Sequence, residues 1–166
     1  FDHEILTNAD KNHTALHLAA GLSGLHRGDM AAAGRALVAI RSARERFEND
    51  PETAYLGRVT AVEENELEAA IALEKKDKDS AEAFFLKAAT IESGLNAPSG
   101  PPLPMKPSFE MYGEFLLDEG RFREAEVQFN KALERTPNRT KSMRGLEKSR
   151  SRSAGQSSSS DTASLQ

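Results

Sequence analysis

The sequence predicts an all-α protein, and three observations support this class. Apolar residues make up 38% and charged residues 29% of the 166 residues, in a mixture rich in helix-forming residues and poor in the β-branched and aromatic residues that strands prefer. Apolar residues recur at intervals of three and four along much of the chain, which is the spacing of one helix face. The breaks between these segments fall at Gly, Asp and Pro, the residues that typically end or begin helices.

The first helix pair is expected to begin near residue 12. Asn12 or Thr14 can cap a helix that ends near Gly28, because glycine suits a C-terminal turn. Asp29 suits the N-cap of a second helix, which should end at residues 49–51, where the sequence reads Asn-Asp-Pro.

A second pair should follow, with helices over about 53–76 and 81–94. Residues 96–107 then hold five prolines in twelve residues. Because proline removes a helical donor and biases the residue before it towards extended geometry, this stretch must be a non-helical connector.

A third pair is expected over about 108–119 and 121–135, followed by a last helix that begins near Asn138 and fades near Arg150. We interpret residues 1–11 as an N-terminal extension at the start of a fragment and residues 12–150 as one helical repeat domain. Residues 151–166 are rich in serine and poor in apolar residues, so we expect a disordered tail.

The three pairs share a packing pattern. Each second helix has a small residue, a large apolar residue four positions later and a small or aliphatic residue three after that: Ala33, Leu37 and Ile40; Ala81, Phe85 and Ala88; Ala125, Phe129 and Ala132. Twelve residues before each first alanine lies another small residue: Gly21, Ala69 and Gly113. Two antiparallel helices approach closely only where a small residue lies at the crossing, so the pattern indicates a repeated helix pair.

The pattern resembles the tetratricopeptide repeat family. The stretch 106–139 fits its consensus best, at Gly113, Leu116, Gly120, Phe122, Ala125, Phe129, Ala132 and Pro137. The two earlier units are divergent, with starts about 48 and 44 residues apart in place of the family's roughly 34. The resemblance implies antiparallel helix pairs stacked as an α-solenoid.

Few residues suggest catalysis. The chain has no cysteine, which excludes disulfides, thiol catalysis and zinc–thiolate sites. His13 and His17 lie on one helix face, near His3 or Glu4, but a metal needs three or four convergent ligands. We therefore interpret His17 as a half-buried packing residue and His13 as a surface residue, and expect no metal and no cofactor.

The acidic residues are expected to lie in solvent. Glu63, Glu64, Glu66, Glu68 and Glu74 form a charge run on one predicted helix, a pattern typical of a solvated face. No histidine or lysine pairs with them as an acid and base would, and no phosphate loop is present. The sequence therefore predicts that the protein is not an enzyme.

The resemblance also implies a binding groove, lined by the first helix of each pair. The matching positions, together with a basic stripe on the last helix, are Leu18, Leu22, Glu63, Glu66, Glu110, Glu114, Leu117, Asp118, Lys141, Arg144 and Lys148. The Lys and Asn residues with which the family's best-known grooves clamp a C-terminal carboxylate are missing. An acidic middle favours a basic or amphipathic protein or peptide segment as the partner.

The net charge of −4 argues against a general nucleic-acid binder, and no apolar run reaches the roughly 20 residues that span a membrane. The prediction is a non-catalytic scaffold that binds other proteins. Two alternatives remain open: a regulatory or accessory domain of an enzyme whose catalytic part lies upstream of Phe1, and a metal-dependent hydrolase that uses His13 and His17. The oligomeric state and the compartment stay open.

Overall fold

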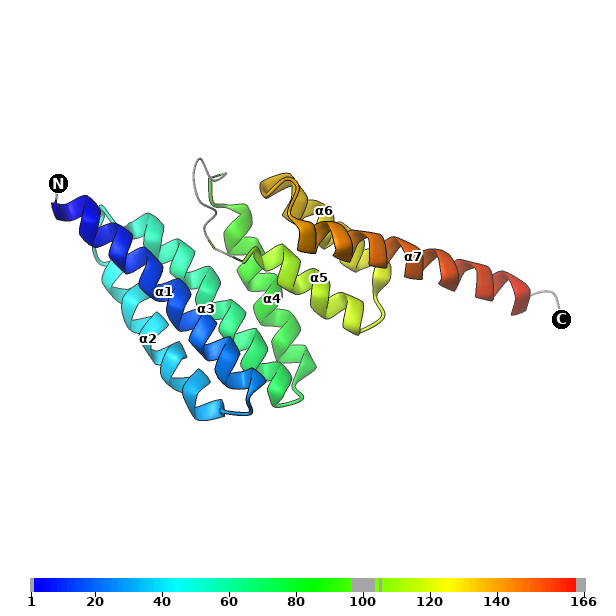
Figure 1. Cartoon of the computed structure of the whole chain (residues 1–166), viewed down its shortest axis with the longest axis horizontal. Helices are drawn as coiled ribbons and strands as arrows, with labels where there is room; N and C mark the ends of the chain where they lie inside the picture. Colours follow the sequence, from blue (N-terminus) through cyan, green and yellow to red (C-terminus); the bar gives the residue numbers. More distant parts are fainter. Residues whose placement is uncertain (1, 97–103, 105, 164–166) are drawn as a thin grey trace. The chain divides into compact units, whose positions relative to one another are not determined.

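The computed structural model describes the backbone of residues 2–96, 104 and 106–163, and the side chains of residues 14–96, 104 and 106–155. Within this part the chain forms seven helices and no strand (Figure 1), which confirms the all-α prediction. The chain divides into two compact units, Phe1–Ser108 and Phe109–Gln166. Each unit is described by itself.

Unit 1 contains four helices joined by short turns: α1 (Asp2–His26), α2 (Met30–Glu48), α3 (Ala54–Glu74) and α4 (Lys78–Ser93). Figure 1 shows that successive helices run in opposite directions. The third helix has the central place, because α3 contacts α1, α2 and α4.

The first helix begins earlier than the sequence analysis expects. α1 starts at Asp2 and not at Asn12 or Thr14. The segment 2–11 contains neither proline nor glycine, so nothing in it interrupts a helix. The side chains before Thr14, including His3, Glu4 and His13, lie outside the described residues, and the separate extension at 1–11 stays a prediction.

The N-cap predicted at Asp29 is confirmed, and Asp77 caps α4 in the same way. The Asp29 side chain accepts a hydrogen bond from the Ala32 N–H at 2.9 Å, and Asp77 accepts one from the Ser80 N–H at 3.0 Å. Each bond satisfies one of the unpaired donors at the start of a helix.

The turn before each second helix also has one form in all three pairs. In each turn, the residue just before the N-cap has a left-handed backbone conformation: Gly28 (φ +75°), Lys76 (φ +64°) and Gly120 (φ +74°). These residues are 48 and 44 positions apart, the same intervals that separate the packing alanines of the three predicted units. Lys76 adopts this conformation although it has a side chain, at a cost of about 1 kcal/mol or more. The repeated turn supports the interpretation of three related pairs.

The core of unit 1 forms where α1, α2 and α3 cross. Its buried residues are Leu18, Leu25, Ala33, Ala36, Ile40 and Leu67. A Cβ added at Gly21 would lie 2.8 Å from both methyl carbons of Leu67 and 3.1 Å from the Ala36 Cβ. The small residue predicted at this crossing therefore lets Leu67 fill the space between α1 and α2.

Unit 2 is built from α5 (Ser108–Asp118), α6 (Phe122–Arg135) and α7 (Thr140–Ala163). Its central side chain is Phe129, which has no exposed surface. A Cβ added at Gly113 would lie 3.0 Å from two ring carbons of Phe129, and one added at Gly145 would lie closer still. Glycines on α5 and α7 therefore make room for one aromatic ring on α6.

The last helix is longer than expected. α7 continues past Arg150 to Ala163, through a segment that the composition predicts to be disordered. The segment contains no proline, so no residue in it is incompatible with a helix. Its side chains are described only up to Gly155, and the tail at 151–166 stays a prediction.

The connector agrees with its proline content where it is described. α4 ends at Ser93 and α5 begins at Ser108, and the described residues between them are not helical. Residues 97–103 and 105 lie outside the described part, and with them most of the predicted connector.

The close packing on Phe129 gives a first testable prediction. Gly113→Ala and Gly145→Ala should each lower the free energy of unfolding by about 1–3 kcal/mol, because the added methyl group must displace the ring in a filled core. Gly34→Ala is the control: Gly34 lies within α2 and an added Cβ would meet nothing within 4 Å. It should raise stability by up to about 1 kcal/mol through helix propensity alone. Urea unfolding measures all three. Equal effects at the three glycines would contradict the packing.

Candidate functional site

The residues predicted to line one groove are divided between the two units. Leu18, Leu22, Glu63 and Glu66 belong to unit 1, and the seven from Glu110 to Lys148 belong to unit 2. Whether they share one groove stays a prediction, so we describe each unit's share separately.

The two leucines of unit 1 belong to the core. Leu18 is buried, and Leu22 is half-buried against the cluster that contains Leu67. A partner could reach Leu22 only at its exposed edge, so these residues stabilise the helix packing.

The prediction of a solvated acidic face on α3 is wrong for most of the run. Glu63 is 1% exposed, Glu66 has no exposed surface and Glu64 is 8% exposed. Only Glu74, in the last turn, is fully exposed. The physical reason is the central position of α3, since three other helices contact it and leave little of its surface to solvent.

Two of these carboxylates pair with arginines of α2. Arg41 Nε donates to Glu64 Oε1 at 3.0 Å, and a second guanidinium nitrogen of Arg41 binds Glu68. Arg44 Nε lies 3.1 Å from Glu64 Oε2. The carboxylates raise the pKa of Arg41, chiefly through the hydrogen bond that Arg41 donates to Glu64. These pairs tie α2 to α3.

Glu63 and Glu66 have a different environment, because burial disfavours their charged form. Burial raises the pKa of Glu63 to about 7, although a hydrogen bond with Thr14 opposes the shift. Burial raises the pKa of Glu66 well above its ordinary value, and the nearby Glu63 and Glu92 raise it further. Burial therefore favours the protonated form of Glu66, and Glu63, with a pKa of about 7, is close to half ionised at neutral pH.

The third buried carboxylate of this cluster has a clear structural role. Glu92, near the end of α4, accepts hydrogen bonds from both the N–H and the hydroxyl of Ser108, each at 2.6 Å. Ser108 is the first residue of α5, so Glu92 supplies an acceptor and a negative charge at a helix N-terminus. The two ends of the proline-rich connector are joined by this contact.

In unit 2, Glu110 is also a structural residue. It has no exposed surface, and it accepts hydrogen bonds from Arg139 at 2.7 and 3.0 Å and from the Ser142 hydroxyl at 2.6 Å. Both carboxylate oxygens are therefore engaged inside the unit. Glu110 was predicted to line the groove, and its partners Arg139 and Ser142 were not predicted. A signal for them was the cluster of polar residues at the start of the last helix, on the side that must face α5.

The other predicted groove residues of unit 2 form a surface that we call the α5–α7 face. It consists of Glu114, Leu117, Asp118, Lys141, Arg144 and Lys148. Four of these residues are exposed: Asp118, Lys141, Arg144 and Lys148. Glu114 is half-buried, and Leu117 is buried, with 9% of its surface exposed. Glu114 Oε1 lies 3.7 Å from Lys141 Nζ, which places the two helices' charged rows next to each other.

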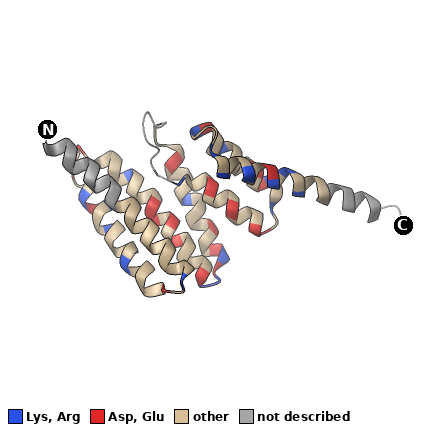
Figure 2. Ribbon diagram, viewed as in Figure 1, with Lys and Arg blue, Asp and Glu red and all other residues tan. Residues whose placement is uncertain are grey.

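The basic row continues along α7 (Figure 2). The row consists of Lys141 and the residues three, seven and eleven positions after it, Arg144, Lys148 and Arg152. All four are exposed, and this spacing places them on one side of the helix. The other side of α7 is marked by Arg150, whose Nε donates to Glu126 of α6 at 2.8 Å. Among the described residues, Arg144 and Lys148 take part in no ion pair.

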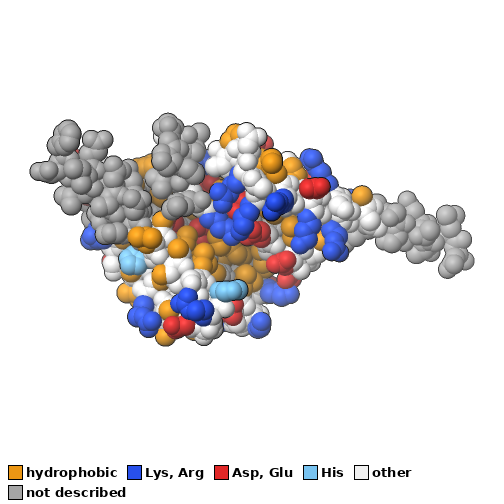
Figure 3. Space-filling model, in the orientation of Figure 1, with side chains coloured by type: hydrophobic (Ala, Val, Ile, Leu, Met, Phe, Trp, Pro, Cys, Tyr) orange, Lys and Arg blue, Asp and Glu red, His pale blue; other side chains and the backbone are white. Residues whose placement is uncertain are grey.

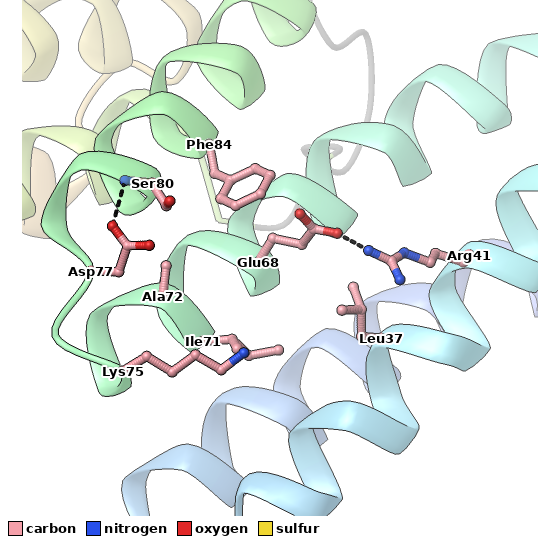
Figure 4. Close-up of a pocket in the computed structure, with 9 residues that line it drawn as sticks. All are labelled: Leu37, Arg41, Glu68, Ile71, Ala72, Lys75, Asp77, Ser80 and Phe84. Atoms are coloured by element: carbon pink, nitrogen blue, oxygen red, sulfur yellow. Dashed lines mark hydrogen bonds and ion pairs between the residues drawn. The ribbon is translucent and has the colours of Figure 1, made fainter.

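A pocket of about 300 Å³ lies between α2, α3 and α4, and Figure 4 shows its lining. Leu37, Ile71 and Phe84 give it apolar walls. Most of its polar groups already have partners within the protein, because Arg41 binds Glu68 and Asp77 accepts a hydrogen bond from the Ser80 N–H. The arrangement offers an apolar recess with Lys75 at its edge, and no acid–base pair poised for catalysis. No sequence pattern indicates this pocket, because its residues come from three helices.

The histidine prediction is corrected in part. His17 is exposed, not half-buried, and His13 lies outside the described side chains. Among the residues that the structure describes, no three His, Asp or Glu side chains are grouped as metal ligands would be. Within the same part of the chain, no helix combines the length and the apolar character needed to cross a membrane.

The comparison with known families bears on α5 and α6. Residues 107–139 match a tetratricopeptide repeat. The matched range begins one residue before α5 and ends just after α6. No curated protein and no solved structure gives a significant match to the chain.

The match confirms the repeat that the sequence analysis identified on Gly113, Phe129 and their neighbours. The tetratricopeptide repeat accounts for the α5–α6 pair, and the all-helical paired architecture is consistent with a solenoid of such units. The two earlier units stay predictions, supported by the shared turn geometry.

The buried acid of α3 gives a pH prediction. The folded protein keeps a proton on Glu63 up to a pH of about 7, whereas the unfolded chain loses it near 4.5. The folded state therefore binds more protons in this window, and stability falls as the pH rises from about 4.5 to 7. Glu63→Gln should reduce this slope and should stabilise the protein at pH 8 by up to about 3 kcal/mol.

Urea unfolding at several pH values between 5 and 8 measures the effect. Glu74→Gln, an exposed position on the same helix, should keep the slope of the parent. Parallel curves for Glu63→Gln and the parent would show that Glu63 ionises normally in the folded state.

The Glu110–Arg139 pair gives a third prediction. Arg139→Ala should cost about 3–5 kcal/mol, because it leaves a buried carboxylate without its cation. Lys141→Ala removes the cation of an exposed pair and should cost less than about 1 kcal/mol. Thermal unfolding compares the two variants, and similar melting temperatures would mean that Glu110 does not depend on Arg139.

Proposed function

We propose that the protein is a non-catalytic scaffold that binds other proteins through its helix pairs, and that the α5–α7 face is its contact surface. A tetratricopeptide repeat with paired helices is typical of protein-binding domains. The observation that carries the proposal is the exposed basic row of α7, which lies beside the matched repeat and, among the described residues, is paired with a carboxylate only at Lys141.

The charges of this face favour an acidic segment as the partner. The sequence analysis favours a basic or amphipathic segment, because it places Glu63, Glu66 and Glu110 in the groove. All three side chains are buried, and Glu110 is already bound by Arg139. The exposed cations Arg144 and Lys148 then dominate this face. An acidic segment complements this surface in charge.

Site-specific photo-cross-linking tests the proposal. A photoreactive residue replaces Lys148 in the full chain, and another replaces Lys87, an exposed residue of α4, as the control position. In an extract of the source cells, we expect protein adducts at position 148 that exceed those at position 87 by about tenfold or more. Unlabelled parent protein should compete for these adducts, whereas the Arg144→Glu/Lys148→Glu variant should not, because its charge is reversed at the contact.

The outcome that rejects the proposal is equal labelling at the two positions, or competition by the reversed variant. If instead adducts form at position 148 and their partner segments are basic, the surface assignment holds and the partner predicted from the sequence replaces the acidic one.

A further inference from the structure

Unit 1 has a second surface that the proposed function does not use. A groove of about 520 Å³ runs between α1 and α2. Its lining comes from one side of each helix: His17, Ala20 and Ser23 of α1 with Arg27 just after it, and Ala32, Arg35, Ala36 and Ala39 of α2. These positions span about 10–15 Å along the two helices, roughly the length of three turns of a third helix.

Large apolar side chains stand beside this groove in solvent. Leu16 is 64% exposed and Val38 is 63% exposed, more than the other large hydrophobic residues of the described part. Leu16 lies four, seven and eleven positions before Ala20, Ser23 and Arg27, and Val38 lies three positions after Arg35, so each shares a helix side with lining residues. An exposed apolar face of this kind indicates that something packs on it.

The opposite side of the same helix pair shows how a helix fits there. α3 packs on α1 and α2 by inserting Leu67 against Gly21 and Ala36. The groove side also presents alanines, Ala20 on α1 and Ala32 and Ala39 on α2, together with the buried Ala36, which contacts both sides. Small residues at these positions allow a helix with leucine-sized side chains to approach closely.

The charge of the groove defines the occupant further. Its ionisable lining residues are His17, Arg27 and Arg35, and the lining contains no acid. Arg27 donates to the neutral Ser23 hydroxyl, and Arg35 takes part in no ion pair among the described residues. The nearest acid in the α1–α2 turn, Asp29, is committed to capping α2. On the face seen in Figure 3, cations and apolar side chains are mixed over the region where α1 and α2 lie.

We propose that the α1–α2 groove docks an amphipathic helix of a partner protein, with leucine-sized residues on one face and carboxylates beside them. The apolar residues fill the space over the alanines and contact Leu16 and Val38, and the carboxylates pair with Arg27 and Arg35. This surface is separate from the α5–α7 face, so the chain would hold two partner segments at once.

A direct binding experiment uses a synthetic probe. The probe is a helical peptide of about 18 residues, built from Leu, Ala and Glu, with leucines at helical spacing along one face. The matched peptide has Lys in place of every Glu. Since the chain has no cysteine, an environment-sensitive dye attaches to the full-length Ala39→Cys variant only at position 39. Its signal therefore reports binding in the groove. A dye on Lys87→Cys is the control.

We expect the acidic peptide to bind at least about tenfold more tightly than the basic one, with a dye response at position 39 and none at 87. Arg27→Glu/Arg35→Glu should weaken binding by about tenfold or more, and circular dichroism should show that this variant remains folded. Arg144→Glu/Lys148→Glu, which tests the other face, should bind the peptide like the parent. Failure of one proposal is thereby distinguishable from failure of the other.

Three results would overturn the inference: no saturable binding of the acidic peptide, equal binding of the two peptides, or binding that survives Arg27→Glu/Arg35→Glu. Sedimentation of the parent without peptide completes the test. A dimer that the same double substitution dissociates would assign the groove to a second copy of the chain in place of a partner helix.

Discussion

Close approach of helices at small residues is the constraint on which the rest of this structure depends. In unit 1 the side chain of Leu67 fits only because Gly21 has no Cβ, and in unit 2 the ring of Phe129 fits only because Gly113 and Gly145 have none. These contacts set the distances between the helices. All other contacts between the helices, including the ion pairs and the surfaces proposed for binding, are possible only at those distances.

The central position of α3 has an electrostatic consequence. A helix that three neighbours contact keeps little surface for its charged residues, and α3 carries several carboxylates. Those near α2 are paired with Arg41 and Arg44. At Glu63 and Glu66 burial outweighs the opposing effects of Thr14 and Lys106, so it favours their protonated forms. Part of the negative charge that the sequence implies is therefore paired or suppressed in the folded protein, and the exposed cations of α1, α2 and α7 gain weight in any interaction.

The two proposed surfaces differ in what they offer a partner. The α5–α7 face is a row of cations beside a matched tetratricopeptide repeat, suited to electrostatic recognition at the surface. The α1–α2 groove is a recess between two helices with apolar side chains at its edge, suited to helix packing with charges as a secondary contact. Two surfaces of different character on separate units are what a scaffold for two partners needs.

The sequence by itself determined the helices, most of their ends and the residues at their crossings. Gly28, Asp29 and Asp77 act locally, and the spacing of Gly113, Ala125 and Phe129 reports a packing that recurs in every unit, so both are visible in one chain. Only the tertiary structure decided which charged residues meet solvent. The burial of Glu66 and the pairing of Glu110 with Arg139 depend on which helices pack on the faces that carry these residues. Periodicity in the sequence indicates a helix face but not which helix packs on it. A polar run on one helix is therefore compatible with a solvated surface and with a buried, partly protonated cluster, and the packing of α1, α2 and α4 around α3 selected the second.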